Sequence, residues 1–411
     1  MTSPFIKSGS TKKSAMKSVI DHLQANLRRL FSGTSSEKRK PEVNGLNPIK
    51  KLLHSLETVS ADAYHKESFQ NHQTIATLPK KMGEIEINDS CNLNCSMCQT
   101  ALSTRQKGLM NLDLFEETVK ASVAAGITRT NLHTIGDPLM NKKLRDYLAI
   151  LRQYKLPVNA LSTNGLLLER HLDLLFEYRD VIRSMRFSID AVNPETYAKI
   201  RVGGNLKSLH ENLIQFVTRN NQAENPYPIG INAVVSMDNY HEIAFIPMVF
   251  SYVARPEKFT FHHISSLSPD NVYFNTKSCF PMQARSATPC DMLWNSIYTL
   301  KEGVLTCCCR DYNGDNVFGK IGEDSLEKLF NGPLIQSWRQ AHLTGDFDRM
   351  PSACQTCYCV DPRLDQLLHA IIQYFYVDIR KHPVYLQSVL DQMLPCLQAK
   401  DYGTVGKIVG L

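Results

Sequence analysis

The segment CNLNCSMCQT, residues 91–100 of a 411-residue chain, brings three thiols together within eight positions. Cys91, Cys95 and Cys98 have the spacing C-x3-C-x2-C, and thiolates so placed on one loop can bind three irons of a 4Fe-4S cluster. The fourth iron is then left open to a substrate or cofactor. A zinc site is the alternative, but the local sequence offers no fourth ligand for a closed structural zinc site. The spacing therefore favours an iron-sulfur cluster.

A second group of cysteines lies in the last third of the chain. Its spacing is C-x12-G-x4-C, followed after a gap by C-x2-C. Four thiolates saturate one 4Fe-4S cluster, whereas a four-thiolate zinc ribbon is the alternative, because C-x2-C pairs also bind zinc. The residues of this pattern are Cys290, Gly303, Cys308, Cys354 and Cys357.

The choice of ligand within the run CCC, residues 307–309, stays open. Adjacent side chains of an extended segment point to opposite faces, so one of them can bind metal while its neighbours face elsewhere. We predict Cys308 as the ligand, with Cys307 or Cys309 as alternatives. The remaining cysteines are expected to pack as small apolar residues, with metal binding an alternative for the first two; they are Cys279, Cys359 and Cys396.

Composition bounds the class of protein and its compartment. The twelve cysteines cluster, which indicates metal ligation in a reducing compartment. No apolar run reaches the roughly 18 residues of a membrane span, and the longest, residues 243–254, is expected to be a buried helix. The first residues lack the apolar region of a secretory signal. We therefore expect an intracellular, cytoplasmic protein.

Positive charge is concentrated at the start of the chain. Residues 1–60 hold 11 Lys and Arg against 4 Asp and Glu, so the body offers no argument for a nucleic-acid partner. Apolar residues recur at helical spacing from Met16 to Phe31, and a polar linker over 32–45 follows. We favour a helix packed on the body or a partly ordered tail. A membrane-surface helix, a targeting peptide and a partner-docking helix are the alternatives.

From residue 84 onward, short β-rich runs alternate with helical stretches. Six such strand-helix units predict parallel strands joined by right-handed crossovers, which gives an α/β fold with a partial (β/α)6 TIM-like barrel. A helix over 112–125 follows the first loop, with Asn111 as its N-cap and Gly126 at its end. The predicted strands cover 84–88, 129–133, 158–162, 184–189, 230–235 and 258–262.

In such barrels the loops after the carboxyl ends of the strands build the active site. The three clustered cysteines follow the first strand, so they are expected at the mouth of the barrel. This arrangement resembles the radical S-adenosylmethionine (SAM) superfamily, whose hallmark is the C-x3-C-x2-C spacing on that loop. The segment TIGDPLM, residues 134–140, is similar to the family's GGEP segment. The resemblance implies that Gly136 and Asp137 receive the amino group of SAM.

The resemblance extends to the next strands. STNG, residues 162–165, ends the third strand, and FSIDAVNPETYAKIRVGG, residues 187–204, ends the fourth. A hydroxyl and a carboxylate two apart on a strand face the same side and could hold a vicinal diol. Met97 departs from the family, which usually has an aromatic residue there, although a thioether can still pack on a purine. The further residues implied at the SAM site are Asn164, Ser188, Asp190, Arg201 and Asn232.

The second cysteine group resembles the auxiliary-cluster fold of the SPASM and twitch subfamilies. That fold places a hairpin between the first two ligands and a short helix before the last two, and EDSLEKLFNG, residues 323–332, fits the helix. The longer SPASM cysteine run is absent, so we expect one auxiliary 4Fe-4S cluster. The resulting divisions are a basic, mainly helical extension over 1–80, a radical SAM core over 81–275, an auxiliary domain over 276–360 and a helical extension over 361–411.

The resemblance implies a reaction. SAM bound to the open iron would be cleaved reductively, with a flavodoxin- or ferredoxin-type donor, to a 5′-deoxyadenosyl radical that removes hydrogen from a substrate. We expect oxidation of a small, sugar-like alcohol, the auxiliary cluster accepting or relaying an electron. A peptide or protein side chain is the alternative substrate, and a non-catalytic iron-sulfur or zinc protein is the third hypothesis. Candidates for the base that takes the proton are His133, Asp137, His262 and His263.

Overall fold

The computed structural model describes most of the chain from residue 46 onward. The predicted helix over 16–31 and the linker over 32–45 lie outside the described residues. Those described are 46–60, 63–64, 69, 71–265, 272–281, 283–284, 290–359, 361–379 and 383–411.

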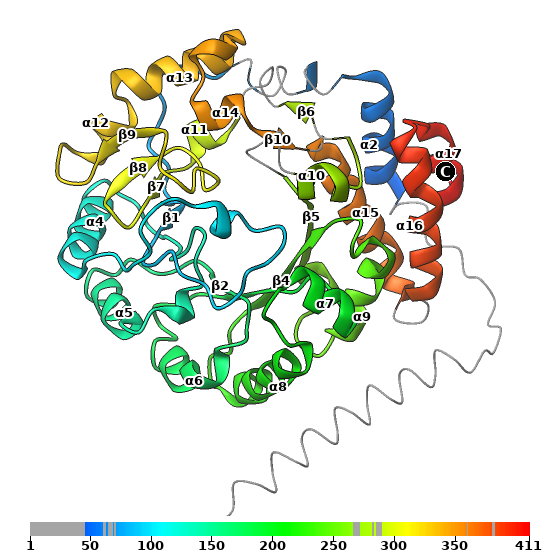
Figure 1. Ribbon diagram of the computed structural model, residues 1–411, viewed down its shortest axis with the longest axis horizontal. Coiled ribbons are helices and arrows are strands. Elements are labelled where there is room, and N and C mark those ends of the chain that lie inside the picture. Colours follow the sequence, from blue (N-terminus) through cyan, green and yellow to red (C-terminus); the bar gives the residue numbers. More distant parts are fainter. Residues whose placement is uncertain are drawn as a thin grey trace, which may run out of the picture.

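Four parallel strands form one side of the barrel, in the order β2-β3-β4-β5 (Figure 1). They are β2 Leu161–Thr163, β3 Met185–Ser188, β4 Ile229–Val235 and β5 Phe259–His263. Consecutive strands are neighbours throughout, as right-handed strand-helix units require. The predicted third to sixth strands are thus confirmed, with shifted ends.

The first two predicted strands are less regular than expected. Only Glu84–Ile85 forms a named strand, β1, and 129–133 contributes isolated parallel bridges that join Lys81 to Arg129 and Thr130 to Val158. The Ile85 amide still donates to the Asn131 carbonyl at 2.9 Å. Six parallel segments therefore follow one another around the partial barrel, which confirms the predicted fold class.

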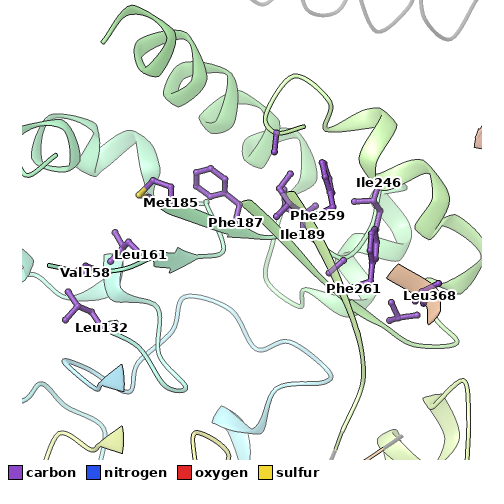
Figure 2. Close-up of a cluster of buried hydrophobic side chains, with 14 of the residues drawn as sticks. Leu132, Val158, Leu161, Met185, Phe187, Ile189, Ile246, Phe259, Phe261 and Leu368 are labelled. Atoms are coloured by element: carbon purple, nitrogen blue, oxygen red, sulfur yellow. The ribbon is translucent and has the colours of Figure 1, made fainter. Parts of the chain in front are cut away.

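Helices cover the outer face of these strands (Figure 1). Figure 2 shows buried strand side chains, including Met185, Phe187 and Phe261, in one apolar cluster. Phe187 packs edge-on against Phe216 of a covering helix. Because side chains alternate along a strand, polar neighbours such as Ser188 face the interior of the barrel. The covering helices are α4 Leu112–Ala124, α5 Leu144–Gln153, α6 Leu168–Glu177, α7 Pro194–Ile200 and α8 Leu206–Gln222.

Helix α4 begins and ends as its caps predict. The Asn111 side chain accepts a hydrogen bond from the Asp113 amide at 2.8 Å. Gly126 adopts φ +77°, the left-handed conformation that glycine tolerates after a helix.

The C-terminal part of the chain extends the barrel sheet. Strand β7 Tyr298–Thr299 pairs in parallel with β1, and β8 Val304–Thr306 and β9 Val317–Lys320 continue antiparallel in the order β1-β7-β8-β9. The predicted hairpin is therefore present and is hydrogen-bonded to the strand that precedes the first cysteine loop. The predicted helix before the last cysteines, α12 Leu326–Phe330, ends two residues before Gly332, because Gly332 caps the next helix, α13 Pro333–Thr344.

The C-terminal helices pack on the body. They are α15 Pro362–Ile379, α16 Pro383–Gln398 and α17 Tyr402–Val409, and they enclose α2 Asn47–Thr58 (Figure 1). Arg363 donates to the Ser55 carbonyl at 2.7 Å, and the Tyr240 hydroxyl donates to the Leu390 carbonyl at 3.0 Å.

The remaining elements are short. Residues 243–254, predicted as a buried helix, form parts of η4 and α9 and are largely buried. Of the helices in the described part of the chain, none is long and apolar enough to cross a membrane. The short elements are η2 Gln99–Leu102, η3 Pro138–Met140, η4 Tyr240–Phe245, α9 Ile246–Val249, η5 Pro256–Lys258, α10 Val272–Lys277, β6 Gln283–Ala284, α11 Met292–Asn295, η7 Phe347–Arg349, α14 Ser352–Gln355 and β10 Tyr358–Cys359.

Candidate active site at the mouth of the barrel

The first cysteine loop lies at the carboxyl end of β1, where the sequence places it. Cys95 is buried, whereas Cys91 and Cys98 are half-buried. Burial, with smaller contributions from nearby Asp137, Cys95 and Cys98, raises the pKa of Cys91 to about 11. Three thiols within electrostatic reach of one another on one loop fit a cluster that replaces their protons with irons.

Polar groups from other loops touch these thiols. The Asn164 side chain, which follows β2, approaches the Cys91 sulfur at 3.8 Å. The Arg201 guanidinium, at the end of α7, approaches the Cys95 sulfur at 3.7 Å. The Thr100 hydroxyl lies 2.9 Å from the Cys98 sulfur. Two of the residues predicted for the SAM site, Asn164 and Arg201, are therefore at the cysteine loop, where donors stabilise negatively charged sulfur.

Gly136 and Asp137 fasten the neighbouring loop onto the cysteine loop. A Cβ atom at Gly136 would lie 2.5 Å from the Asn88 carbonyl oxygen, so only glycine allows this approach. The Asp137 amide donates to the Ser90 carbonyl at 2.9 Å. The buried Asp137 carboxylate accepts from the amides of Leu139 and Asn164 and from the Thr163 hydroxyl.

The Asp137 carboxylate is thus engaged within the protein. Burial raises its pKa, while these hydrogen bonds act in the opposite direction. Its observed contacts fix the loops after β1 and β2, so we assign it a positioning role, and contact with the SAM amino group stays a prediction.

Asp190 and Arg201 form a buried ion pair. Arg201 Nε lies 2.5 Å from an Asp190 oxygen, and the Val234 amide donates to the other oxygen at 2.8 Å. Burial alone would lower the pKa of Arg201, but Asp190 and Cys95 raise it, which keeps the guanidinium charged. The Asp190 carboxylate therefore orients Arg201, and the contact of both residues with SAM stays a prediction.

Ser188, Asn232 and Met97 are half-buried. Ser188 and Asn232 stand opposite each other in the β3-β4 pairing, so both face the same side of the sheet. That side is the interior of the barrel. The structure therefore places Ser188 beside Asn232, and the contact of both residues with SAM stays a prediction.

The histidine candidates for the base differ in burial and in their contacts. His263 is buried and its Nδ1 lies 2.6 Å from Asp365, whereas the His262 side chain is 54% exposed. His263 also packs edge-on against Phe280, and His262 Nδ1 lies 3.8 Å from the same Asp365 carboxylate. Burial lowers the pKa of His133 to about 4, and within the described structure its buried Nδ1 has no hydrogen-bond partner.

Glu84 is a candidate that the sequence reasoning missed. It points into the barrel beside Asn131, whose amide donates to Glu84 Oε1 at 3.2 Å. Its other oxygen is buried and lacks a hydrogen-bond partner among the described residues. Burial, with a smaller contribution from nearby Cys309, raises the pKa of Glu84 to about 8. The alternation of Glu84 and Glu86 with buried isoleucines in EIEIN was the available signal.

The second cysteine group is assembled from three distant segments. The Cys307 thiol is buried and hydrogen-bonds with Cys354, which raises its pKa well above the usual range, and Cys290 is nearby. Cys308 instead contacts Cys309, and Arg310 donates to the Cys357 sulfur at 3.5 Å. Sequence spacing favoured Cys308, but the fold groups Cys307 with Cys290 and Cys354.

No three His, Cys, Asp or Glu side chains in the described part of the chain converge on a point that suits a single metal ion. A 4Fe-4S cluster does not require such convergence, because each thiolate binds a different iron.

Comparison with known proteins gives two domain matches. Residues 85–218 match the model of the radical SAM superfamily, and residues 290–358 match that of an iron-sulfur cluster-binding domain, SPASM. The order and position of the two matches agree with the two cysteine groups.

Similar individual proteins were also found. The probable GTP 3′,8-cyclase of Methanococcus maripaludis is 25% identical over 186 residues, which cover 44% of this chain and 61% of that protein. GTP 3′,8-cyclase of Alkaliphilus oremlandii is 24% identical over 74% of this chain and 87% of its own length. The match to the first relative thus spans less than two thirds of it.

Among solved structures, SuiB of Streptococcus suis bound to the precursor peptide SuiA gives a TM-score of 0.52 at 14% identity, covering 79% of each chain. SuiB has also been solved with S-adenosylmethionine. At this identity, the likeness shows a shared fold.

Proposed function

Because this chain belongs to the radical SAM superfamily and carries a C-terminal SPASM domain, we propose that it cleaves SAM reductively and oxidises a small polar molecule. Cys91, Cys95 and Cys98 would hold the SAM-binding 4Fe-4S cluster. When bound, cluster and SAM supply a 5′-deoxyadenosyl radical that abstracts hydrogen from the substrate. The observation that carries the proposal is the approach of Asn164 and Arg201 to the thiols of Cys91 and Cys95.

The protein's own task at this site is positioning and exclusion of water. Arg201, held by Asp190, places a fixed positive charge beside Cys95. The Asp137 contacts hold the loops after β1 and β2 together. A radical reaction depends on such fixed geometry, because a misplaced substrate lets the radical react elsewhere.

The substrate would lie inside the barrel, towards the second cysteine group. Glu84, Asn131 and His133 project polar groups there, and the charge of Glu84 is within reach of Cys309. Glu84, a carboxyl group whose pKa is raised to about 8, and the neutral imidazole of His133 both offer hydrogen-bonding atoms to a substrate hydroxyl. This arrangement supports a hydrogen-bonding substrate such as a sugar-like alcohol.

The test is anaerobic reconstitution of the full chain, with iron and sulfide counted and 5′-deoxyadenosine followed from SAM plus a strong reductant. We expect about eight irons, as two 4Fe-4S clusters require, and cleavage of SAM. Cys95→Ala should lose about half the iron and all cleavage, whereas Cys357→Ala should lose iron and keep some cleavage. Four irons with cleavage would remove the auxiliary cluster from the proposal.

Substrates are then screened in two arms, polyols and short peptides. Stimulation of 5′-deoxyadenosine formation by polyols alone supports the small-molecule assignment. Stimulation by peptides alone replaces it with side-chain modification. A full iron load without 5′-deoxyadenosine in either arm contradicts the proposal.

A further inference from the structure

Arg105 lies seven residues after Cys98, and its side chain is only 9% exposed. Its guanidinium donates to both carboxylate oxygens of Glu86 and to the Tyr312 carbonyl, the last at 3.2 Å. It also lies 3.5 Å from Asp89 and 3.4 Å from Glu302. One side chain therefore has four partners from three separate segments.

These partners belong to the surroundings of both cysteine groups. Glu86 follows β1, and Asp89 precedes Cys91 by two residues. Glu302 lies in the turn between β7 and β8, and Tyr312 follows the CCC run by three residues. Arg105 thus joins the start of the first cysteine loop to the hairpin and loop of the second group.

A second cation makes the same connection. The Lys301 ammonium lies 3.4 Å from Asp89 and also pairs with Glu302, while the Lys301 amide donates to Glu86 at 3.4 Å. The Thr134 hydroxyl donates to Glu86 from the loop after the second strand. Glu86 and Asp89 are completely buried, so both carboxylates depend on these cations and donors.

The chemistry of arginine suits this position. Burial alone would lower the pKa of Arg105, but hydrogen bonds and charge from Glu86, together with Glu302 and Asp89, raise it and keep it charged. Its planar fork presents five N–H donors, which can serve several partners in fixed directions. A lysine would supply the charge but not the fork.

We propose that Arg105 is a positioning residue that fixes the first cysteine loop against the C-terminal hairpin and so sets the geometry between the two thiol groups. This inference rests on the proposed function, because the separation of the groups matters only when both hold clusters. Without the Arg105 guanidinium, the barrel and its helices stay intact. The β7-β8 hairpin can then shift relative to the first cysteine loop. Shifts of this kind lower catalytic rates strongly.

The test uses the full chain, reconstituted with iron and sulfide, as Arg105→Gln, Arg105→Lys and a control, Arg145→Gln. Arg145 makes an exposed ion pair with Glu177 at 2.5 Å, far from both cysteine groups in the sequence. The readouts are iron content, 5′-deoxyadenosine formed from SAM, and the magnetic interaction between the two reduced clusters measured by pulsed EPR.

We expect Arg105→Gln to keep its iron, to show an altered or broadened interaction between the clusters, and to form 5′-deoxyadenosine on the order of 10- to 100-fold more slowly. Arg105→Lys should lie between it and the wild type, and Arg145→Gln should match the wild type. An unchanged interaction in Arg105→Gln at full iron load overturns the inference.

If Arg105→Gln does not fold, the magnetic interaction between the clusters is measured by EPR in Arg105→Lys and Glu302→Gln instead. A change in the interaction between the clusters supports the inference, and an unchanged interaction overturns it. A wild-type protein that holds both clusters but forms no 5′-deoxyadenosine contradicts the proposed function instead, and the EPR comparison still tests the positioning role.

Discussion

The two cysteine groups differ in how the chain assembles them. The first comes from a single loop of eight residues, and its thiols are contacted by residues from the ends of β2 and α7. The second combines Cys290, the CCC run and the C-x2-C pair, which are separated by many residues, with the β7-β8 hairpin lying between Cys290 and the CCC run.

Because of this difference, the sequence predicts the ligands of the first group more fully than those of the second. In the first group the ligand spacing is a local property of the chain, and the fold adds the polar groups around it. In the second group three adjacent thiols are available, and their surroundings in the fold lead us to predict which of them binds the cluster. Cys307 meets Cys354, whereas Cys308 meets Cys309.

The largest expected effect concerns the ligand choice in the second group. Cys307→Ala should lose about half the iron of a two-cluster protein, because Cys307 is the thiol that contacts Cys354. Cys308→Ala should retain nearly all of it. Iron and sulfide analysis of both reconstituted variants checks this, and the reverse result would return the ligand to Cys308.

In the first group, Arg201→Gln should be strongly destabilising. The change leaves the Asp190 carboxylate buried without its cation, which costs about 3–5 kcal/mol, and it removes the donor to Cys95. Chemical denaturation of the apoprotein measures the loss. The exposed pair of Arg219 with Asp173 is the control, because Arg219→Gln should cost at most about 1 kcal/mol. Equal losses of unfolding free energy in the two variants would show that the buried Asp190–Arg201 pair contributes no more than the exposed pair.

Gly136→Ala should have a smaller but measurable effect. Its Cβ would lie 2.5 Å from the Asn88 carbonyl oxygen, so the loop must move away from the cysteine loop. We expect a loss of about 1–3 kcal/mol in unfolding free energy and weaker SAM binding. Gly108→Ala, whose Cβ would meet a Lys301 carbon at an ordinary 3.8 Å, is the matched control. Unchanged SAM affinity in Gly136→Ala would argue against the role of this loop.

The smallest expected effect concerns His210, which belongs to neither cysteine group. His210 stacks on Phe250 and pairs with the Tyr252 hydroxyl at 2.8 Å, and burial lowers the pKa of His210 to about 4. The unfolded chain therefore binds this proton first, so stability falls as pH decreases from about 6.5 to about 4 and levels off below that. Unfolding free energies across this range should decline less in His210→Phe. An identical pH slope in both proteins would contradict this assignment.

The barrel could be predicted from the sequence because its strands and helices leave periodic patterns and caps among neighbouring residues. Alternating apolar residues predicted the later strands, and the caps Asn111 and Gly126 predicted the bounds of α4. The second strand was harder, because 129–133 pairs only through isolated bridges. The pairing of β7 with β1 was also hidden, since two-residue strands carry no period.

The sequence by itself determined the spacing of Cys91, Cys95 and Cys98, their place after the first strand, and the presence of a second thiol group. Only the tertiary structure decided that Asp137 and Asp190 are held by internal partners, that Glu84 is buried beside Asn131, and that Arg105 contacts both Glu86 and Tyr312. The physical reason is the distance along the sequence over which each feature is set. Thiol spacing is set by neighbouring residues, but the partner of a buried charge comes from wherever the fold brings a compensating group within hydrogen-bonding distance.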